Sequence, residues 1–98
     1  MPQFNTSTQT DTLLDTPRMY KVILHNDHYT SMDFVIKVLI EIFHKNNLEA
    51  QRIMINIHEK GKGLCGIYTY EIAATKVEQV TKLARAHEFP LLATLEEE

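Results

Sequence analysis

The ten residues HNDHYTSMDF, positions 25–34, gather side chains that could do chemistry. They include an amide at Asn26, a carboxylate at Asp27 and imidazoles at His25 and His28. Imidazole and carboxylate groups can hold a metal ion or transfer protons, and amide and carboxylate oxygens accept hydrogen bonds. Asn and Asp also bond to their own backbone in turns. Taken alone, the stretch favours a plain turn, and its neighbours must decide whether it is more.

The five histidines suggest a metal site, since Asp27 lies between His25 and His28. A structural zinc site, however, needs about four converging ligands, usually with a pair of cysteines or a pair of histidines on a helix. The only cysteine lies in an apolar run, and His44 and His87 are expected at exposed helix ends. We therefore expect no metal and no cofactor.

Cys65 and His58 could form a nucleophile and its base. Cys65 lies in the apolar run LCGIYT, however, where a buried and inert thiol is the usual case. The run GKGLCG lacks the spacing of a phosphate-binding loop and opens a strand, not a helix. We therefore expect no enzymatic activity.

The composition narrows the classes of protein further. The chain has 98 residues, 44% hydrophobic and 23% charged, which predicts one soluble globular domain. A net charge of -3 does not favour nucleic acid as a partner. No apolar run reaches the roughly 18–20 residues of a membrane span, and no signal peptide is apparent. With one cysteine and no internal disulfide, we expect a cytoplasmic protein.

Hydrophobic periodicity predicts the elements that position these side chains. Residues 1–17 are rich in Thr, Gln, Asn and Ser, which predicts a flexible tail before a core domain of residues 18–98. Alternation in MYKVILH, residues 19–25, predicts a strand with Tyr20, Val22 and Leu24 on one face. The short apolar runs at residues 64–69 and 91–96 predict two more strands.

Three stretches with helical spacing lie between these strands. Their predicted N-cap residues are Thr30, Asn46 and Thr69. Asp33 and Glu49 stand three residues after the first two caps, in the position of a capping box. Two glycines suit the turn after the second helix: Gly61 and Gly63.

The apolar side of each helix indicates what it buries. The first helix, which we expect to end around residues 44–47, turns inward Phe34, Val35, Val38, Leu39, Ile42 and Phe43. The second turns inward Ala50, Ile53, Met54 and Ile57. The third turns inward Ile72, Ala73, Lys76, Val77, Val80, Leu83 and Ala84. The order β-α-α-β-α-β predicts an α+β fold, with a small three-stranded antiparallel sheet and three helices packed on one face.

Together these pieces resemble the ClpS adaptor family. The resemblance covers residues 19–96 and rests on MYKVIL, ND, YT and MDFVI, then on IH, CGIYTYEIA and TKV, and finally on FPLLATLE. The family has the fold β-α-α-β-α-β. Its members bind proteins that begin with Leu, Phe, Tyr or Trp and hand them to a ClpA-type AAA+ unfoldase, which feeds the ClpP protease. The resemblance implies the same work for this chain.

The resemblance also gives the polar stretch a purpose. A free α-amino group is an ammonium with three donors, which needs acceptors in a partly buried pocket. By the resemblance, the acceptors are the amide oxygen of Asn26, the carboxylate of Asp27 and the neutral ring of His58. The family usually reads Asn-Asp-Asp, so His28 replaces the second acid and could accept only when neutral. Ser31 replaces a common proline.

The remaining family positions also map onto this chain. The implied hydrophobic pocket consists of Thr30, Met32, Val35, Met54, Ile57 and Leu91. Met32 matches a gatekeeper thought to exclude the β-branched residues Val and Ile. The unfoldase contact maps onto Glu71 and Lys76, and residues 1–17 match the delivery segment in position. The alternative is a non-enzymatic binding module of similar fold to the ribosomal protein L7/L12 C-terminal domain. The combination of Asn26, Met32 and His58 discriminates between the two, because only the amine pocket needs all three.

Overall fold

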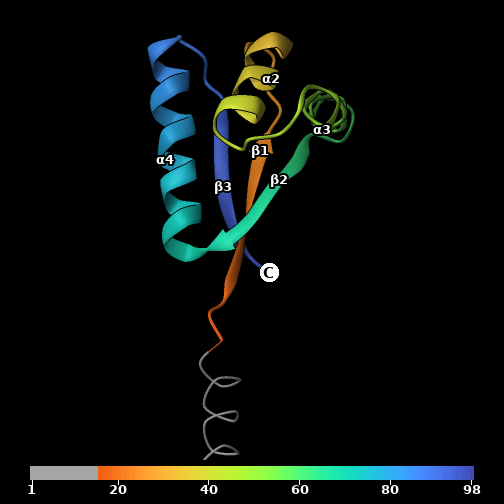
Figure 1. Cartoon of the computed structure of the whole chain (residues 1–98). Coiled ribbons are helices and arrows are strands. Elements are labelled where there is room, and N and C mark those ends of the chain that lie inside the picture. The colour runs from red at the N-terminus through yellow and green to blue at the C-terminus, as the bar shows by residue number, and fades with distance from the viewer. Residues whose placement is uncertain (1–15) are drawn as a thin grey trace, which may run out of the picture.

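A computed structural model describes residues 16–98 of the chain. Within them the elements are, in order, β1 (Met19–His25), α2 (Met32–Glu41), α3 (Asn47–Lys60), β2 (Lys62–Thr69), α4 (Tyr70–Ala86) and β3 (Leu92–Glu97) (Figure 1). The predicted order β-α-α-β-α-β is confirmed, with β2 beginning before residue 64 and β3 beginning after residue 91. Most of the predicted tail, residues 1–17, lies outside the described residues.

β1 is the central strand of an antiparallel sheet with the order β2-β1-β3. Val22 and Leu24 are fully buried on the predicted inner face, but Ile23 on the other face is buried as well at 6% exposure, so burial alternates only in part. The pairing with β2 shifts after Val22, where the register passes over Cys65. Such a bulge bends the strand locally and increases its twist.

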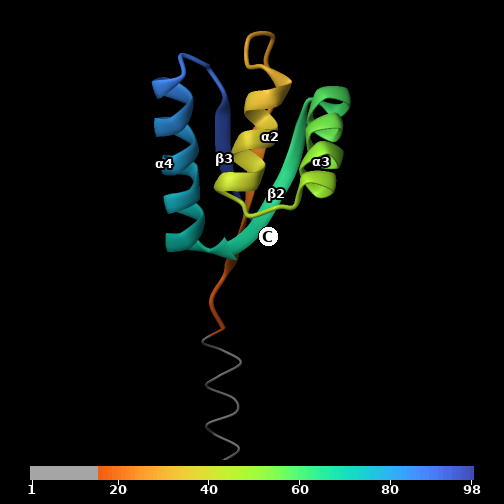
Figure 2. The ribbon, with the colours of Figure 1, turned by 45° about the horizontal axis from the view of Figure 1, so that its top comes forward.

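The three helices of the described part lie on one face of the sheet, with α2 between α3 and α4 (Figure 2). Their apolar sides meet Val22 and Leu24 in one core. The buried helix residues of this core are Phe34, Val35, Val38, Leu39, Ala50, Ile57, Ala73, Val80 and Ala84. The predicted α+β architecture is therefore confirmed.

The start of α2 differs by one residue from the prediction. Ser31 is the N-cap, because its Oγ accepts a hydrogen bond from the Phe34 N–H at 3.1 Å. Thr30 instead donates its hydroxyl to the carboxylate of Asp27, which draws it away from the helix end. The predicted capping box of Thr30 and Asp33 is therefore wrong.

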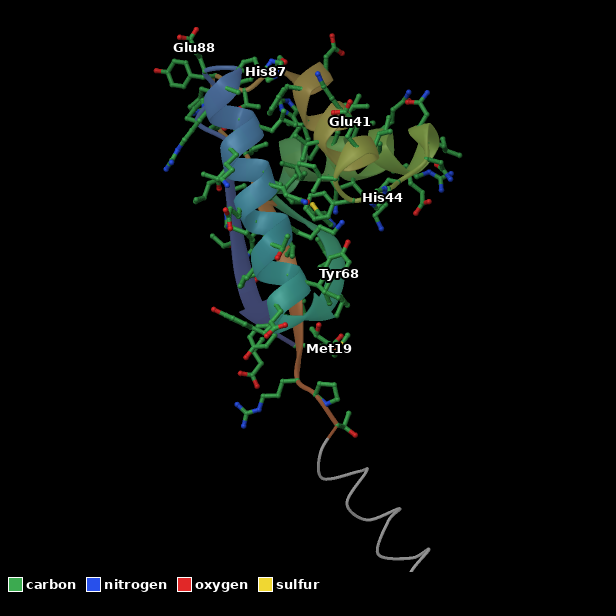
Figure 3. The ribbon with its side chains drawn as sticks, turned by 60° about the vertical axis from the view of Figure 1, so that its left-hand side comes forward. Met19, Glu41, His44, Tyr68, His87 and Glu88 are labelled. Carbon is green, nitrogen blue, oxygen red and sulfur yellow. The ribbon has the colours of Figure 1, made fainter. Side chains whose placement is uncertain are left out.

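α2 ends at Glu41, before the predicted residues 44–47. Ile42 is its C-cap, and the Lys76 Nζ of α4 donates to the Ile42 carbonyl oxygen at 2.6 Å. This places a positive charge where the helix dipole is negative, and it ties α4 to α2. His44 follows with a left-handed backbone at φ 56°, at the turn toward α3 (Figure 3).

The predicted cap of α3 is confirmed, since Asn46 Oδ1 accepts from the Glu49 N–H at 2.8 Å. Gly61 ends the helix in the left-handed conformation at φ 89°, which glycine adopts without a steric penalty. The predicted place of Gly63 in this turn is wrong, because Gly63 lies buried in β2. A Cβ atom on Gly63 would come within 2.6 Å of Ile57 Cγ1, so glycine lets β2 pass close to α3.

Thr69 precedes α4 as predicted, but its side chain makes no capping hydrogen bond. Ala73, Val80 and Ala84 are buried on the predicted inner side of the helix. Ile72 is 51% exposed, so its predicted inward position is wrong. The buried residues follow a narrow stripe at helical spacing, and a residue directly beside Ala73 in sequence points about 100° away from that stripe.

Candidate functional site

A cavity of about 610 Å³ lies where the loop between β1 and α2 meets α2 and the second half of α3. Its lining residues are Asn26, Asp27, His28, Tyr29, Thr30, Ser31, Met32, Val35, Met54, Ile57 and His58. All four residues predicted to bind an amine are among them. So are all the predicted pocket residues except Leu91. The fold thus brings two segments that are well separated in sequence to one site.

The four residues predicted to bind an amine are here called the polar rim: Asn26, Asp27, His28 and His58. The side chains of Asn26, His28 and His58 are exposed. The backbone N–H of Asn26 donates to the carbonyl oxygen of Gly61 at 2.8 Å. Because Gly61 ends the helix that carries His58, this bond links the two halves of the polar rim.

The carboxylate of Asp27 is bonded within its own loop. Its Oδ1 accepts from the N–H groups of Tyr29 at 2.8 Å and Thr30 at 2.6 Å, and its Oδ2 accepts from the Thr30 hydroxyl at 2.7 Å. Partial burial acts to raise the pKa of Asp27, but these hydrogen bonds and the nearby His28 outweigh it and hold the pKa below its usual value. Asp27 is therefore ionised at neutral pH.

The apolar residues at the base of the cavity are here called the apolar floor: Val35, Met54 and Ile57. Val35 and Ile57 are 7% and 2% exposed and belong to the core, and Met54 packs against it. Met32 lines the cavity at the start of α2 and is 48% exposed. A methionine is flexible and can adjust to the shape of a bound group. The cavity can therefore hold an apolar side chain close to hydrogen-bond acceptors.

The structure adds Tyr29 and Ser31 to the predicted lining. Tyr29 is 79% exposed, and an aromatic residue inside a polar loop was the sequence signal that could have identified it. Leu91 is not among the residues that line this cavity. It is 5% exposed and lines a separate cavity of about 210 Å³ between the end of α4 and β3, together with Phe89 and Pro90.

Glu71 and Lys76, the predicted unfoldase contacts, both lie on α4, which adds no residue to the lining of the large cavity. Glu71 is exposed in the first turn of the helix. Lys76 is only partly exposed, because it bonds to the Ile42 carbonyl and its Nζ lies 5.8 Å from the centre of the Tyr68 ring. Lys76 therefore has a structural role in addition to any role in docking.

Burial raises the pKa of the Cys65 thiol to about 12, so the thiol stays protonated at neutral pH. Thiolate chemistry with His58 therefore has no support at this position. Within residues 16–98, no group of three or more His, Cys, Asp or Glu side chains is arranged to hold a metal ion. In the same part of the chain, no helix is both long and apolar enough to cross a membrane.

Comparison with known proteins identifies the family. The family described as ATP-dependent Clp protease adaptor protein ClpS matches residues 15–94. Curated relatives named ATP-dependent Clp protease adapter protein ClpS also match most of the chain. The relative from Syntrophus aciditrophicus is 58% identical over 81 residues, which is 83% of this chain and 76% of the relative. The relative from Acetivibrio thermocellus is 56% identical over 82 residues, which is 84% of this chain and 83% of the relative.

A solved structure has the same fold. It is that of Agrobacterium tumefaciens ClpS2 bound to L-phenylalaninamide, with a TM-score of 0.81 and 36% sequence identity. The match covers 84% of this chain and 99% of that chain. The relatives are named as adaptors, which are not enzymes. The chain therefore belongs to the ClpS family and is a non-enzymatic adaptor protein of a Clp protease.

Proposed function

We propose that this adaptor binds substrate proteins through an N-terminal Leu, Phe, Tyr or Trp residue and delivers them to a ClpA-type AAA+ unfoldase for degradation by ClpP. The observation that carries the proposal is the polar rim beside the apolar floor in one cavity. An N-terminal residue carries an ammonium and a side chain on the same carbon, so it would occupy both at once. The phenylalaninamide bound by the Agrobacterium relative has this chemistry and supports the proposal.

The polar rim suits an α-ammonium group, which has three donors and no acceptor. The side-chain oxygen of Asn26 and an unprotonated ring nitrogen of His58 would each accept a hydrogen bond. Asp27 lies in the same rim, with its carboxylate bonded to Tyr29 and Thr30. His28 would contribute an acceptor only in its neutral form. Acceptors are required because an ammonium without them would lose its hydration uncompensated.

The apolar floor suits a long or aromatic side chain that enters beyond Met32. A β-branched side chain carries its bulk next to the backbone, at the cavity edge where Met32 lies. We infer that Met32 disfavours Val and Ile at this edge, while Leu, Phe, Tyr and Trp place their bulk deeper, against Val35 and Ile57.

Docking on the unfoldase would use Glu71 and Lys76 of α4. Because α4 is not part of the cavity lining, substrate and unfoldase could be bound together. Residues 1–17 would serve as the delivery segment, since at roughly 3.3–3.6 Å per residue they span about 55–60 Å when extended. The protease is ATP-dependent, so we place this activity in the cytoplasm, where ATP is available.

Binding and delivery can be separated by truncation. A chain that begins at Arg18 keeps the whole cavity and α4, so it should bind Phe-first peptides and the unfoldase like the full chain. It should no longer speed degradation of a Phe-first substrate by the unfoldase and ClpP, because the unfoldase has no segment to grip. Undiminished degradation at matched occupancy would show that residues 1–17 have no part in delivery.

A binding module like the ribosomal protein L7/L12 C-terminal domain is the second candidate that the sequence left open. The presence of Asn26, Met32 and His58 in one lining favours the adaptor, because only an amine pocket needs all three.

The proposed recognition is tested with L-phenylalaninamide and N-acetyl-L-phenylalaninamide in a calorimetric titration. Acetylation removes the charge of the α-nitrogen and leaves that nitrogen with one N–H donor in place of three. The acetylated compound should bind about 30- to 1000-fold more weakly, which corresponds to roughly 2–4 kcal/mol. Equal affinity for the two compounds would refute amine recognition.

A further inference from the structure

The hydrogen bonds of Asp27 give this residue a more specific part in the proposed function. Its carboxylate accepts from the N–H groups of Tyr29 and Thr30 and from the Thr30 hydroxyl, all within the loop that connects β1 to α2. An Asp that bonds to the backbone two and three residues ahead closes a turn. Three of the roughly four acceptor sites of the carboxylate are therefore occupied within the loop.

The loop that Asp27 closes lies between two fixed points. On one side, the Asn26 N–H is bonded to the Gly61 carbonyl at the end of α3. On the other side, Ser31 caps α2, which begins with Met32. Between these two points, residues 27–30 are held by the hydrogen bonds of Asp27 to Tyr29 and Thr30. The loop is therefore held at both ends and in its middle, between Asn26 and Met32, which both line the cavity.

We propose that Asp27 is a positioning residue, which holds Asn26 and Met32 in place around a bound N-terminal residue instead of accepting hydrogen bonds from its amine. The inference rests on the proposed function and assigns one residue of its site. Asp27 acts through the loop, whereas Asn26 and His58 contact the ammonium.

Two substitutions at Asp27 distinguish these roles. Asp27→Asn removes the charge, but its Oδ1 can still accept from both N–H groups, and its amide can donate to the Thr30 hydroxyl. Asp27→Ala removes both the charge and the loop bonds. If Asp27 positions the loop, Asp27→Ala should weaken binding of L-phenylalaninamide about 10- to 100-fold. Asp27→Asn should keep the affinity within about threefold of that of the wild type.

Two further variants of the full chain complete the experiment. Thr30→Val removes one of the three loop bonds and should weaken binding about three- to tenfold, with no further loss when it is added to Asp27→Ala. Asp33→Ala is the matched control, because Asp33 is an exposed acid in the first turn of α2 outside the cavity lining. It should bind like the wild type. Thermal unfolding of each variant checks that the fold is retained.

Amide hydrogen exchange gives a readout that does not depend on binding. Slow exchange at Tyr29 and Thr30 should persist in Asp27→Asn and be lost in Asp27→Ala. Equal loss of affinity in both Asp27 variants would show that the charge acts on the ammonium directly, and it would overturn the positioning role. Unchanged affinity in Asp27→Ala would overturn it too. If the wild type bound the acetylated amide equally well, the proposed function itself would fail, and this inference with it.

Discussion

The apolar floor and the polar rim of the cavity are built in different ways. Val35 and Ile57 of the apolar floor are also residues of the protein core, at 7% and 2% exposure. Asn26, His28 and His58 of the polar rim are exposed and rest on a short loop and on the last turns of α3. The apolar floor is thus part of the protein core, whereas these residues of the polar rim lie outside the core.

Stability and specificity can therefore be altered separately in this cavity. A change in the apolar floor alters core packing, so it should affect folding and binding together. A change at the exposed residues of the polar rim, Asn26, His28 or His58, removes exposed atoms and should affect binding with little effect on folding. Substitutions at Ile57, His58 and Met32 test this separation, and a substitution at Asp27 tests the loop that carries the polar rim.

The largest effect is expected from Ile57→Ala in the apolar floor. Truncating a buried isoleucine should lower the free energy of unfolding by about 2–5 kcal/mol and weaken binding of L-phenylalaninamide as well. Ile55→Ala is the matched control, because Ile55 lies on the same helix and is 48% exposed. Urea unfolding measures the stability of both variants, and a calorimetric titration measures their binding. Similar stability of the two variants would contradict the assignment of Ile57 to a shared core and floor.

His58→Ala should affect binding alone. The loss of one hydrogen bond to a charged group should cost about 1.5–3 kcal/mol of binding free energy, while the free energy of unfolding changes by no more than about 0.5 kcal/mol. His44→Ala is the control, since His44 is an exposed histidine outside the cavity lining. A loss of stability that matched the loss of affinity would end the distinction between floor and rim.

Met32→Ala should change selectivity more than affinity. Removing the side chain opens the cavity edge, so L-valinamide should gain about 1–3 kcal/mol of binding free energy relative to L-phenylalaninamide. Leu48→Ala, an exposed apolar residue on α3 outside the lining, is the control. Competition titrations measure the ratio, and an unchanged preference would leave Met32 without a gating role.

The smallest effect concerns pH and the Asp27 carboxylate. Its pKa is lower in the folded protein than its usual value of about 3.9, so ionised Asp27 stabilises the fold above that pH. This contribution is lost as the pH falls through the lower folded value. The difference in unfolding free energy between wild type and Asp27→Asn should therefore shrink below about pH 4. A difference that stays constant from pH 7 to pH 3 would contradict the lowered pKa.

Periodicity predicted the apolar floor more securely than the details of the loop. Val35 and Ile57 each belong to a row of apolar residues at helical spacing, and such spacing predicts which side of a helix is buried. Thr30 and Ser31 are both residues that cap helices, and the sequence alone does not say which one bonds to the helix. The structure decides in favour of Ser31 because Asp27 engages Thr30.

Partners from distant parts of the chain could not be predicted in the same way. The spacing of α4 placed Lys76 on an inner side, but it gave no indication that its amine meets the carbonyl of Ile42 at the end of α2. The bond between Asn26 and Gly61 is equally invisible to periodicity, because it depends on how β1 and α3 end beside each other. Such contacts depend on the packing of whole elements.

We expect an N-terminal residue to bind in the large cavity, with its amine at the polar rim and its side chain on the apolar floor. A titration of the isotope-labelled full chain with L-phenylalaninamide, followed by NMR, tests it most directly. The largest shifts should fall on residues 26–32 and on Met54, Ile57 and His58, and the N-acetylated compound should produce much smaller shifts at equal concentration. Shifts centred on α4 or around Leu91, with no response at Asn26 and His58, would show that the N-terminal residue binds elsewhere.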